Sequence, residues 1–327
     1  MQALTIIGAG PAGGSAALRA LSLEQSVTIY EKSAFPRHKV CGEFLSPEAE
    51  QVFQTLGVWD QVQHARPARL TRVLLQFARS SKAWALEEPA LSISRYTLDW
   101  LLLNQAIERG AKLIQESFEE AAEPRIVAHG RKLTAPKGRR LFGYKAHFSG
   151  PVDDTVAMYF FGRGYAGVSA IEGGFTNVCG LAPEDRLRAC DFDLDTYTSK
   201  FVPLRRRISP LTRTMDWLVT GPLVFSTDVQ PPSVEAEYRA GDALGFIDPF
   251  TGSGILSALE TGRIAAESAA EGLRVEEHVA RCRAALGRQY RFAGLARAAI
   301  ESGWAERLLP FAPGSLLFRM TRPSIVS

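Results

Sequence analysis

The stretch Ala3-Leu4-Thr5-Ile6-Ile7-Gly8-Ala9-Gly10-Pro11-Ala12-Gly13 decides the fold of this 327-residue chain. An apolar run over residues 3–7 predicts a strand, and residues 12–21 are rich in small residues and predict a helix. A second strand, Val27–Tyr30, ends in Glu31. A G-x-G-x-x-G turn between strand and helix, followed about 20 residues later by an acid, is typical of Rossmann-like dinucleotide binding.

Each residue of this turn has its own task. Gly8 makes the tight turn, Gly10 lets the backbone approach a pyrophosphate, and Gly13 lets the helix pack closely on the sheet. Pro11 and Ala12 begin the helix, whose free N–H groups attract phosphate. Glu31 would accept hydrogen bonds from an adenosine ribose and disfavours a 2′-phosphate. The pocket is therefore expected to hold FAD or NAD rather than NADP.

A second glycine-rich turn distinguishes FAD from NAD. Residues 241–254 read Gly-Asp-Ala-Leu-Gly-Phe-Ile-Asp-Pro-Phe-Thr-Gly-Ser-Gly and precede a helix predicted over residues 255–270. Asp242 can accept hydrogen bonds from sugar-alcohol hydroxyls, and NAD has no ribityl chain. The start of the helix would stabilise the negative charge that a flavin gains on reduction. The two turns together predict FAD.

The distal turn also carries a family resemblance. Residues 240–259 closely resemble the flavin motif of the geranylgeranyl reductase-like flavoproteins, a group within the larger family of aromatic hydroxylases (p-hydroxybenzoate hydroxylase type) and flavin-dependent halogenases. Residues 35–43, Phe-Pro-Arg-His-Lys-Val-Cys-Gly-Glu, resemble the reductase group's Pro-Arg-x-Lys-x-Cys-Gly stretch beside the isoalloxazine. Residues 94–99 resemble the family's Arg-x-x-Leu/Phe-Asp helix start, whose arginine, here Arg95, lies near the cofactor.

From the turns and the resemblance we predict a single set of cofactor-binding residues. They are Gly8, Gly10, Pro11, Ala12, Gly13, Glu31, Lys32, Arg37, Cys41, Gly42, Arg95, Asp242, Pro249, Gly252, Gly254 and Ile255. The chain departs from the family where an Ala-Asp-Gly-x-x-Ser turn is usual. Residues 126–132 stand there, and His129 replaces the usual acid, which predicts an altered adenine-side wall.

The arrangement of segments predicts an α/β fold. It has a Rossmann-like FAD-binding lobe, an inserted, mostly antiparallel β-sheet substrate lobe, and C-terminal helices. The FAD lobe is expected to be discontinuous, from residues 1–65, 95–130 and 235–285. Residues 66–94 and 131–234 are expected to form the substrate lobe, and residues 286–327 the C-terminal helical segment.

Composition fits a soluble enzyme with a substantial core. The hydrophobic share is 46% and the net charge is +3, which is too small to indicate a nucleic-acid partner. Neither a secretion signal nor an apolar run of about 18 residues is apparent, so we expect a cytoplasmic protein. The four cysteines show no C-x-x-C pair, and we predict neither a metal site nor a disulfide.

Three fates of a reduced flavin give three hypotheses. The favoured one is reduction of a carbon–carbon double bond in an apolar, prenyl or polyketide-like substrate, with Cys41 as the catalytic residue that shapes the pocket or helps proton transfer. The alternative is hydroxylation of a small aromatic or polyketide substrate through a flavin C4a-hydroperoxide. Halogenation ranks third, because the chain has no Trp-x-Trp-x-Ile-Pro string.

Several further points stay open. The chain has no second G-x-G-x-x-G, so we expect NADPH or NADH to dock transiently as reductant, or a partner protein to supply electrons. A covalent flavin link through Cys41 or His38 and an impaired, non-catalytic FAD binder are minor alternatives.

Substrate contacts are predicted from residues 142–148 and 159–165, at Tyr144, His147, Phe161 and Tyr165. The apolar segment from Trp304 to Met320 is expected to pack on the protein or to contact lipid at a membrane surface.

Overall fold

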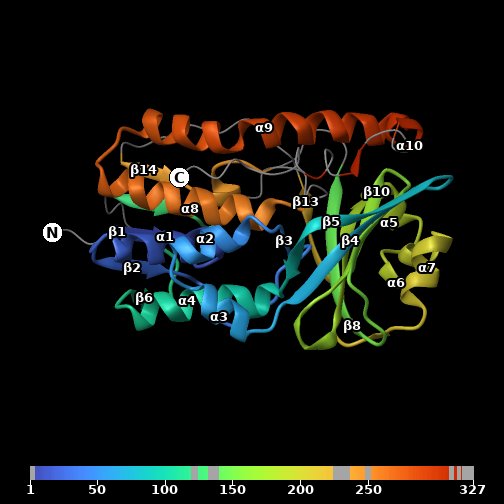
Figure 1. Ribbon diagram of the computed structural model, residues 1–327, viewed down its shortest axis with the longest axis horizontal. Coiled ribbons are helices and arrows are strands. Elements are labelled where there is room, and N and C mark those ends of the chain that lie inside the picture. Colours follow the sequence, from blue (N-terminus) through green and yellow to red (C-terminus); the bar gives the residue numbers. More distant parts are fainter. Residues whose placement is uncertain are drawn as a thin grey trace.

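The fold contains two sheets joined by helices (Figure 1). The computed structural model describes residues 4–118, 124–131, 140–223, 236–246, 252–308, 313–314 and 318. Pro249, predicted to bind the cofactor, lies outside these ranges, as does most of the segment from Trp304 to Met320.

The first sheet is the predicted Rossmann-like sheet, and every pairing within it is parallel. Its strand order is β14-β7-β1-β2-β6. The strands are β1 (Leu4–Ile7), β2 (Val27–Tyr30), β6 (Lys112–Ile114), β7 (Arg125–Val127) and β14 (Glu237–Arg239). Ile6, Ile29 and Ile126 are fully buried at its centre, which explains the continuous apolar runs in the sequence.

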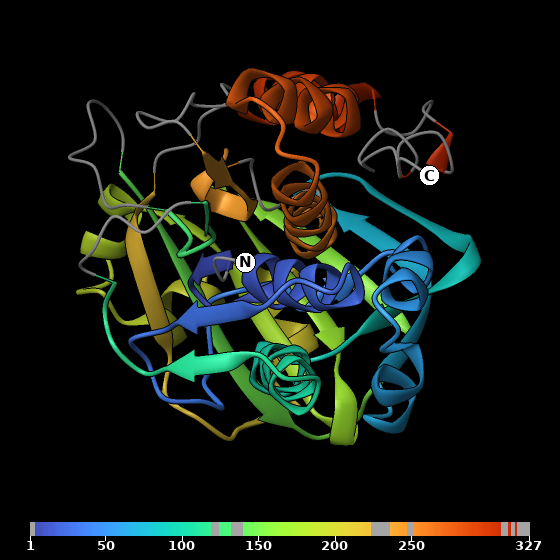
Figure 2. The same cartoon turned by 90° about the vertical axis from the view of Figure 1, so that its left-hand side faces the viewer.

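Helices from distant parts of the chain pack on this sheet. Helix α1 (Pro11–Ser22) lies against both α4 (Arg95–Glu108) and α8 (Gly254–Ala270). Figure 2 shows α9 (Val275–Glu301) outermost, above α8, with α1 beneath α8. Helices α2 (Ala49–Thr55) and α3 (Trp59–His64) complete this part of the molecule.

The second sheet is nine-stranded and mostly antiparallel, as predicted, with a parallel pairing between β4 and β9. Its main path is β12-β8-β11-β10-β9-β4-β5-β3, and β13 pairs with β8. The strands are β3 (Phe44–Leu45), β4 (Ala68–Gln76), β5 (Ser81–Ser92), β8 (Leu141–Ser149), β9 (Thr155–Phe161), β10 (Gly164–Ala170), β11 (Thr176–Pro183), β12 (Thr212–Arg213) and β13 (Leu218–Leu223).

Three short helices pack on one face of the second sheet: α5 (Glu184–Arg188), α6 (Leu194–Ser199) and α7 (Val202–Ile208). The side chains of Tyr144, Ala146 and Phe148 point to them from β8. Lys145 and His147 alternate with these residues, so they point to the opposite face, towards Glu43.

The predicted domain limits remain a prediction, and two elements cross them. Strand β3 lies within the segment 1–65 but pairs with β5 of the second sheet. Helix α9 passes through the expected boundary at residue 285 without a break and is followed by α10 (Trp304–Leu308). Among the described residues, none of the helices combines the length and apolar character needed to span a bilayer.

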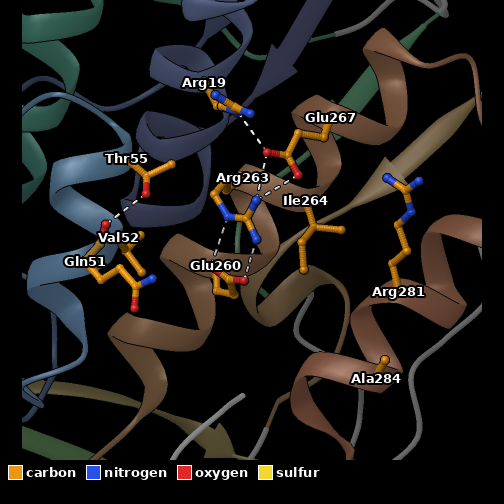
Figure 3. A pocket seen from close by; sticks show the side chains of 10 residues that line it. All are labelled: Arg19, Gln51, Val52, Thr55, Glu260, Arg263, Ile264, Glu267, Arg281 and Ala284. Atoms are coloured by element: carbon orange, nitrogen blue, oxygen red, sulfur yellow. Dashed lines mark hydrogen bonds and ion pairs between the residues drawn. The ribbon is translucent and has the colours of Figure 1, made fainter. Parts of the chain in front are cut away.

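A cavity of about 620 Å³ lies between α1, α2, α8 and α9, and charged side chains project around it (Figure 3). Arg263 donates to both Glu260 and Glu267, and Arg19 of α1 donates to Glu267 at 2.8 Å. The two arginines and the two glutamates are thus paired, and the pair of Arg19 with Glu267 joins α1 to α8. The network therefore braces α1 against α8, which carry the two glycine-rich turns at their N-terminal ends.

We expect Glu267→Gln to lower the free energy of unfolding by about 1–3 kcal/mol, because Arg263 and Arg19 would lose a partly buried partner. Urea unfolding measures this change. Glu271→Gln is the matched control, because Glu271 pairs with Arg281 at 2.7 Å on the exposed surface and such pairs contribute little. Equal losses in the two variants would contradict a bracing role for Glu267.

Candidate functional site

The first glycine-rich turn is as tight as the motif predicts. Gly8 has φ +100°, and a Cβ there would lie 2.6 Å from the carbonyl oxygen of Ala128. A Cβ on Gly13 would overlap the carbonyl oxygen of Gly8. Gly10 caps α1 without a side-chain hydrogen bond, and Pro11 is the first helical residue. The start of α1 thus offers backbone N–H groups to an anion.

The second turn contacts the first. Gly241 has φ +59°, and a Cβ there would lie 3.0 Å from the Cβ of Ala12. A Cβ on Gly262 of α8 would overlap the carbonyl oxygen of Ala12. The two turns, more than 200 residues apart in sequence, therefore meet at one edge of the parallel sheet.

Glu31 lies at the end of β2 and is 8% exposed. Its carboxylate accepts hydrogen bonds from the N–H groups of Ala9 (3.0 Å) and Ser33 (2.9 Å) and from Arg37 (3.0 Å). Burial alone would raise the pKa of Glu31, but these donors outweigh it and the pKa is lowered. The carboxylate is therefore charged at neutral pH and retains acceptor capacity for a further donor.

Arg37 is the side chain that most clearly lacks partners here. Its Nη2 bonds Glu31, whereas its Nε and Nη1 are buried without a hydrogen-bond partner among the described residues. Its guanidinium lies 4.4 Å above the ring of Phe35. Unpaired buried donors are costly, and an anionic or hydroxyl-rich ligand would satisfy them.

Arg95 and Asp242 lie near this edge. Arg95 forms a bidentate pair with buried Asp99, at 2.6 and 2.7 Å, and a Cβ on Gly10 would lie 3.5 Å from its Nη2. Asp242 is accessible to solvent but largely surrounded by protein, so desolvation raises its pKa while Arg95 and Arg131 oppose the rise.

The remaining predicted cofactor residues divide into exposed and buried positions. Lys32 and Gly42 are exposed, and Gly252 has φ +66° beside the ring of Phe44. Gly254 begins α8, and Ile255 follows it at 5% exposure.

Cys41 is half-buried between the two lobes. Its Sγ accepts the N–H of Glu43 at 3.4 Å, and its carbonyl accepts the amide of Asn177 at 3.0 Å. Burial raises the pKa of the Cys41 thiol, and the charge of Glu43 adds to this against the opposing effect of Arg95. At neutral pH the group is a thiol, which can donate a proton and is a poor nucleophile.

A buried polar cluster lies beside Cys41, formed by Glu43, Lys145 and His147, with His38 at its edge. Glu43 is fully buried, has φ +56°, and accepts from Lys145, from His147 Nε2 at 2.8 Å and from the N–H of Arg95 at 2.7 Å. Burial would raise the pKa of Glu43, but His147 and Lys145 outweigh it and the pKa is lowered. Glu43 thus ties the FAD lobe to the second sheet.

His38 lies at the edge of this cluster. Its ring stacks on Tyr96 at 4.8 Å and meets His147 edge-on at 5.1 Å. Its Nδ1 is buried without a partner among the described residues. Desolvation, together with Lys145 and His147, lowers the pKa of His38, so its ring is neutral at pH 7.

The structure separates the four predicted substrate residues. His147 and Tyr165 lie on the face of the second sheet that points to the FAD lobe. Tyr144 and Phe161 lie on the opposite face, where they pack on Tyr197 of α6. The prediction placed all four on the side of the flavin. Because successive side chains of a strand point to opposite faces, Tyr144 and Phe161 lie on the face opposite to His147 and Tyr165.

The described residues fit FAD at this edge. The glycine turns leave room for a backbone–pyrophosphate contact, Glu31 is a charged acceptor at one end, and Asp242 lies at the other. The Nε and Nη1 groups of Arg37, which have no hydrogen-bond partner among the described residues, could donate to the cofactor. The sequence did not identify Glu43, Lys145 or Asn177, although a lysine two residues from His147 on one strand face was a usable signal.

Sequence relatives support this interpretation. No protein-family model matches the chain. It is 25% identical over 319 residues to the menaquinone reductase of Mycobacterium tuberculosis, covering 81% of this chain and 75% of the relative. It is 26% identical over 334 residues to digeranylgeranylglycerophospholipid reductase 1 of Methanopyrus kandleri, covering 84% and 82%.

Solved structures share the fold. The flavin-dependent brominase Bmp2 aligns with a TM-score of 0.76 at 17% identity, over 97% of this chain and 92% of that one. A flavoprotein/dehydrogenase from Cytophaga hutchinsonii gives 0.76 at 17% identity, over 98% and 90%. The flavin-dependent halogenase CmlS gives 0.74 at 22% identity, over 98% and 68%. These likenesses confirm the predicted fold class.

We expect Glu31→Gln to weaken FAD binding about tenfold, because a charged acceptor for the ribose is lost and the single amide oxygen can accept from only one of the N–H groups of Ala9 and Ser33. Titration of the apoprotein with FAD, followed by flavin fluorescence, measures the affinity. Glu50→Gln, at an exposed position of α2, is the control. An unchanged affinity in Glu31→Gln would remove Glu31 from the cofactor site.

We expect Glu43→Gln to lower the free energy of unfolding at pH 7 by about 3 kcal/mol, because Lys145 stays buried without its anion. Since the pKa of Glu43 is lowered in the folded protein, its stabilisation is present above the ordinary glutamate pKa of 4.5 and is lost as pH falls through the folded value. Unfolding curves between pH 3 and 7 should therefore be flatter for the variant. Parallel curves would contradict this assignment.

Proposed function

Because the chain is a geranylgeranyl reductase-like FAD-dependent oxidoreductase of the hydroxylase and halogenase superfamily, we propose that it reduces a carbon–carbon double bond in an apolar, prenyl-bearing substrate. The observation that carries the proposal is the half-buried thiol of Cys41 beside the Glu43 cluster, between the FAD lobe and the face of the second sheet that carries Lys145 and His147. The names of the two relatives support a lipid substrate, since menaquinone and digeranylgeranylglycerophospholipid both carry isoprenoid chains.

The face of the second sheet that carries Lys145 and His147 continues into an apolar wall. We define this wall as Phe77, Phe160, Tyr165 and Leu181. The rings of Phe77 and Phe160 stack with their centroids 4.7 Å apart. Leu181 of β11 pairs with Gly143 of β8, and Cys179 pairs with Lys145, so Leu181 and Lys145 lie on the same face of the sheet. All four side chains are buried, and Ile300 and Ala305 pack against the cluster that contains them. The region next to Lys145 and His147 is therefore apolar and dry, which supports an apolar substrate over a polar one.

When bound, FAD supplies hydride transfer between a reductant and an acceptor, and the protein supplies orientation and electrostatics. In this proposal the turn residues 8–13 and Asp242 orient the cofactor. Cys41, neutral at pH 7, holds the proton that reduction of a double bond requires. Glu43 fixes Lys145 and His147 beside it, and the apolar wall excludes water. NADPH or NADH is the proposed transient reductant.

Anaerobic reoxidation tests this function. Holoenzyme reduced by light, without dioxygen, should regain its oxidised flavin spectrum when an isoprenoid quinone or a geranylgeranyl lipid is added. The product should gain two hydrogen atoms at a carbon–carbon double bond of the isoprenoid chain; a gain at the quinone oxygens alone would contradict the proposal. Cys41→Ser should slow this step by about 100-fold, because a serine hydroxyl is a weaker acid in the same position.

The other outcomes are equally specific. Reoxidation that requires dioxygen and yields a product heavier by one oxygen would support the hydroxylase and contradict the reductase. An unchanged rate in Cys41→Ser would remove the thiol from proton transfer while leaving the reductase intact.

A further inference from the structure

The outward side of α9 and α10 carries exposed arginines next to exposed large apolar residues. Arg288, Arg291, Leu295 and Ala298 are all exposed and recur at intervals of three or four residues, so they share one helix face. Leu295 is 70% exposed. Beyond Gly303, Trp304 of α10 is 56% exposed, and the guanidinium of Arg307 lies 5.9 Å from its ring. We call these six residues, Arg288, Arg291, Leu295, Ala298, Trp304 and Arg307, the α9–α10 surface.

The other side of the same helices faces the protein. Cys282, Leu286 and Tyr290 are buried with α8 and Leu244. Towards the C-terminal end, Ile300 and Ala305 pack against the cluster that contains the apolar wall. Figure 1 shows α9 running from above the FAD lobe to the second sheet, with α10 at that end. The α9–α10 surface is thus one helix thickness from the wall proposed to contact substrate.

The charge of this region is positive. Residues 281–308 contain six arginines and two glutamates. Glu306 is engaged by the N–H of Arg79 at 2.5 Å. Within the described ranges, Arg288 and Arg291 form no ion pair with a carboxylate. The surface therefore combines unneutralised cations with a leucine and a tryptophan, the pairing that interfacial helices use at the boundary of an anionic bilayer.

A second copy of the chain is a less suitable occupant. A twofold contact centred on this surface would place Arg288 and Arg291 of one copy against the same residues of the other. Such a contact would desolvate like charges without partners, which is strongly unfavourable. An anionic lipid surface instead neutralises the arginines and buries Leu295 and Trp304.

We propose that the α9–α10 surface docks the protein on an anionic lipid bilayer and brings the apolar wall close to substrates dissolved in that bilayer. The docking follows from the surface itself, while the identity of the substrate rests on the proposed function. A prenyl lipid would then enter from the membrane without crossing water.

Vesicle sedimentation of the full-length holoenzyme, without substrate, tests the docking. We expect binding to vesicles of phosphatidylcholine with one-third phosphatidylglycerol, weaker binding at high salt, and little binding to phosphatidylcholine alone. Arg288→Gln/Arg291→Gln should weaken binding about tenfold or more. Leu295→Gln/Trp304→Gln should weaken binding at low salt as well. Arg205→Gln/Arg206→Gln, with two exposed arginines on α7, is the matched control and should bind like the wild type.

Three results would overturn the docking. They are no binding by the wild type, equal binding by the surface variants and the control, or a loss of self-association in Leu295→Gln/Trp304→Gln, which would assign the surface to a second copy. Flavin content and thermal unfolding verify that each variant folds. Anaerobic reoxidation with detergent-dispersed substrate should not change in these variants. That assay tests the reductase proposal, and the vesicle assay tests docking, so the failure of one can be told from the failure of the other.

Discussion

The close packing of α1 on α8 is the constraint on which the rest of the site depends. Ala12 lies against Gly241 and Gly262, and any side chain larger than hydrogen at either glycine would press on it. This contact joins residues from both ends of the chain and brings two helix N-termini to the same edge of the parallel sheet. The charged brace of Arg19, Arg263 and Glu267 then holds the pair in this position. A cofactor with adenosine at one end, a flavin at the other and a pyrophosphate between them can therefore be held from both turns at once.

The sequence predicted those parts of the site that depend on local rules. The turns at Gly8–Gly13 and Gly241–Gly254 carry strand, glycine and helix signals over short distances, and β1, α1, β2 and α8 lie within one residue of the predicted limits. Ala128 and His129, directly after β7, pack against Gly8 even though the family's acid is absent. Backbone carbonyl and Cα atoms of residues 128–129, rather than a side chain, make this contact, which explains why the substitution is compatible with the fold.

The Glu43 cluster was not predictable because it exists only in three dimensions. Glu43 follows a family motif, Lys145 and His147 lie on one strand a hundred residues later, and Arg95 begins α4. No local pattern joins them. The same reason explains why Tyr144 and Phe161 lie on the other face from His147 and Tyr165, since an aromatic residue on a strand indicates burial but not the face. Only the register of β8 against β11, together with the helices on one side, separates Tyr144 from Lys145.

The two faces of the second sheet differ in chemical character, and this difference bears on the proposed reduction. Tyr144, Tyr197 and Phe161 give one face a dry aromatic core that fixes the sheet. The other face carries polar groups at Lys145 and His147 next to an apolar wall from Phe160 to Leu181. Because Lys145 is paired with Glu43 and His147 is hydrogen-bonded to the same carboxylate, the polar end stays compatible with an apolar chain beside it. In the proposed reaction, a protonated Cys41 next to these polar groups would supply a proton at a site from which the apolar wall excludes water.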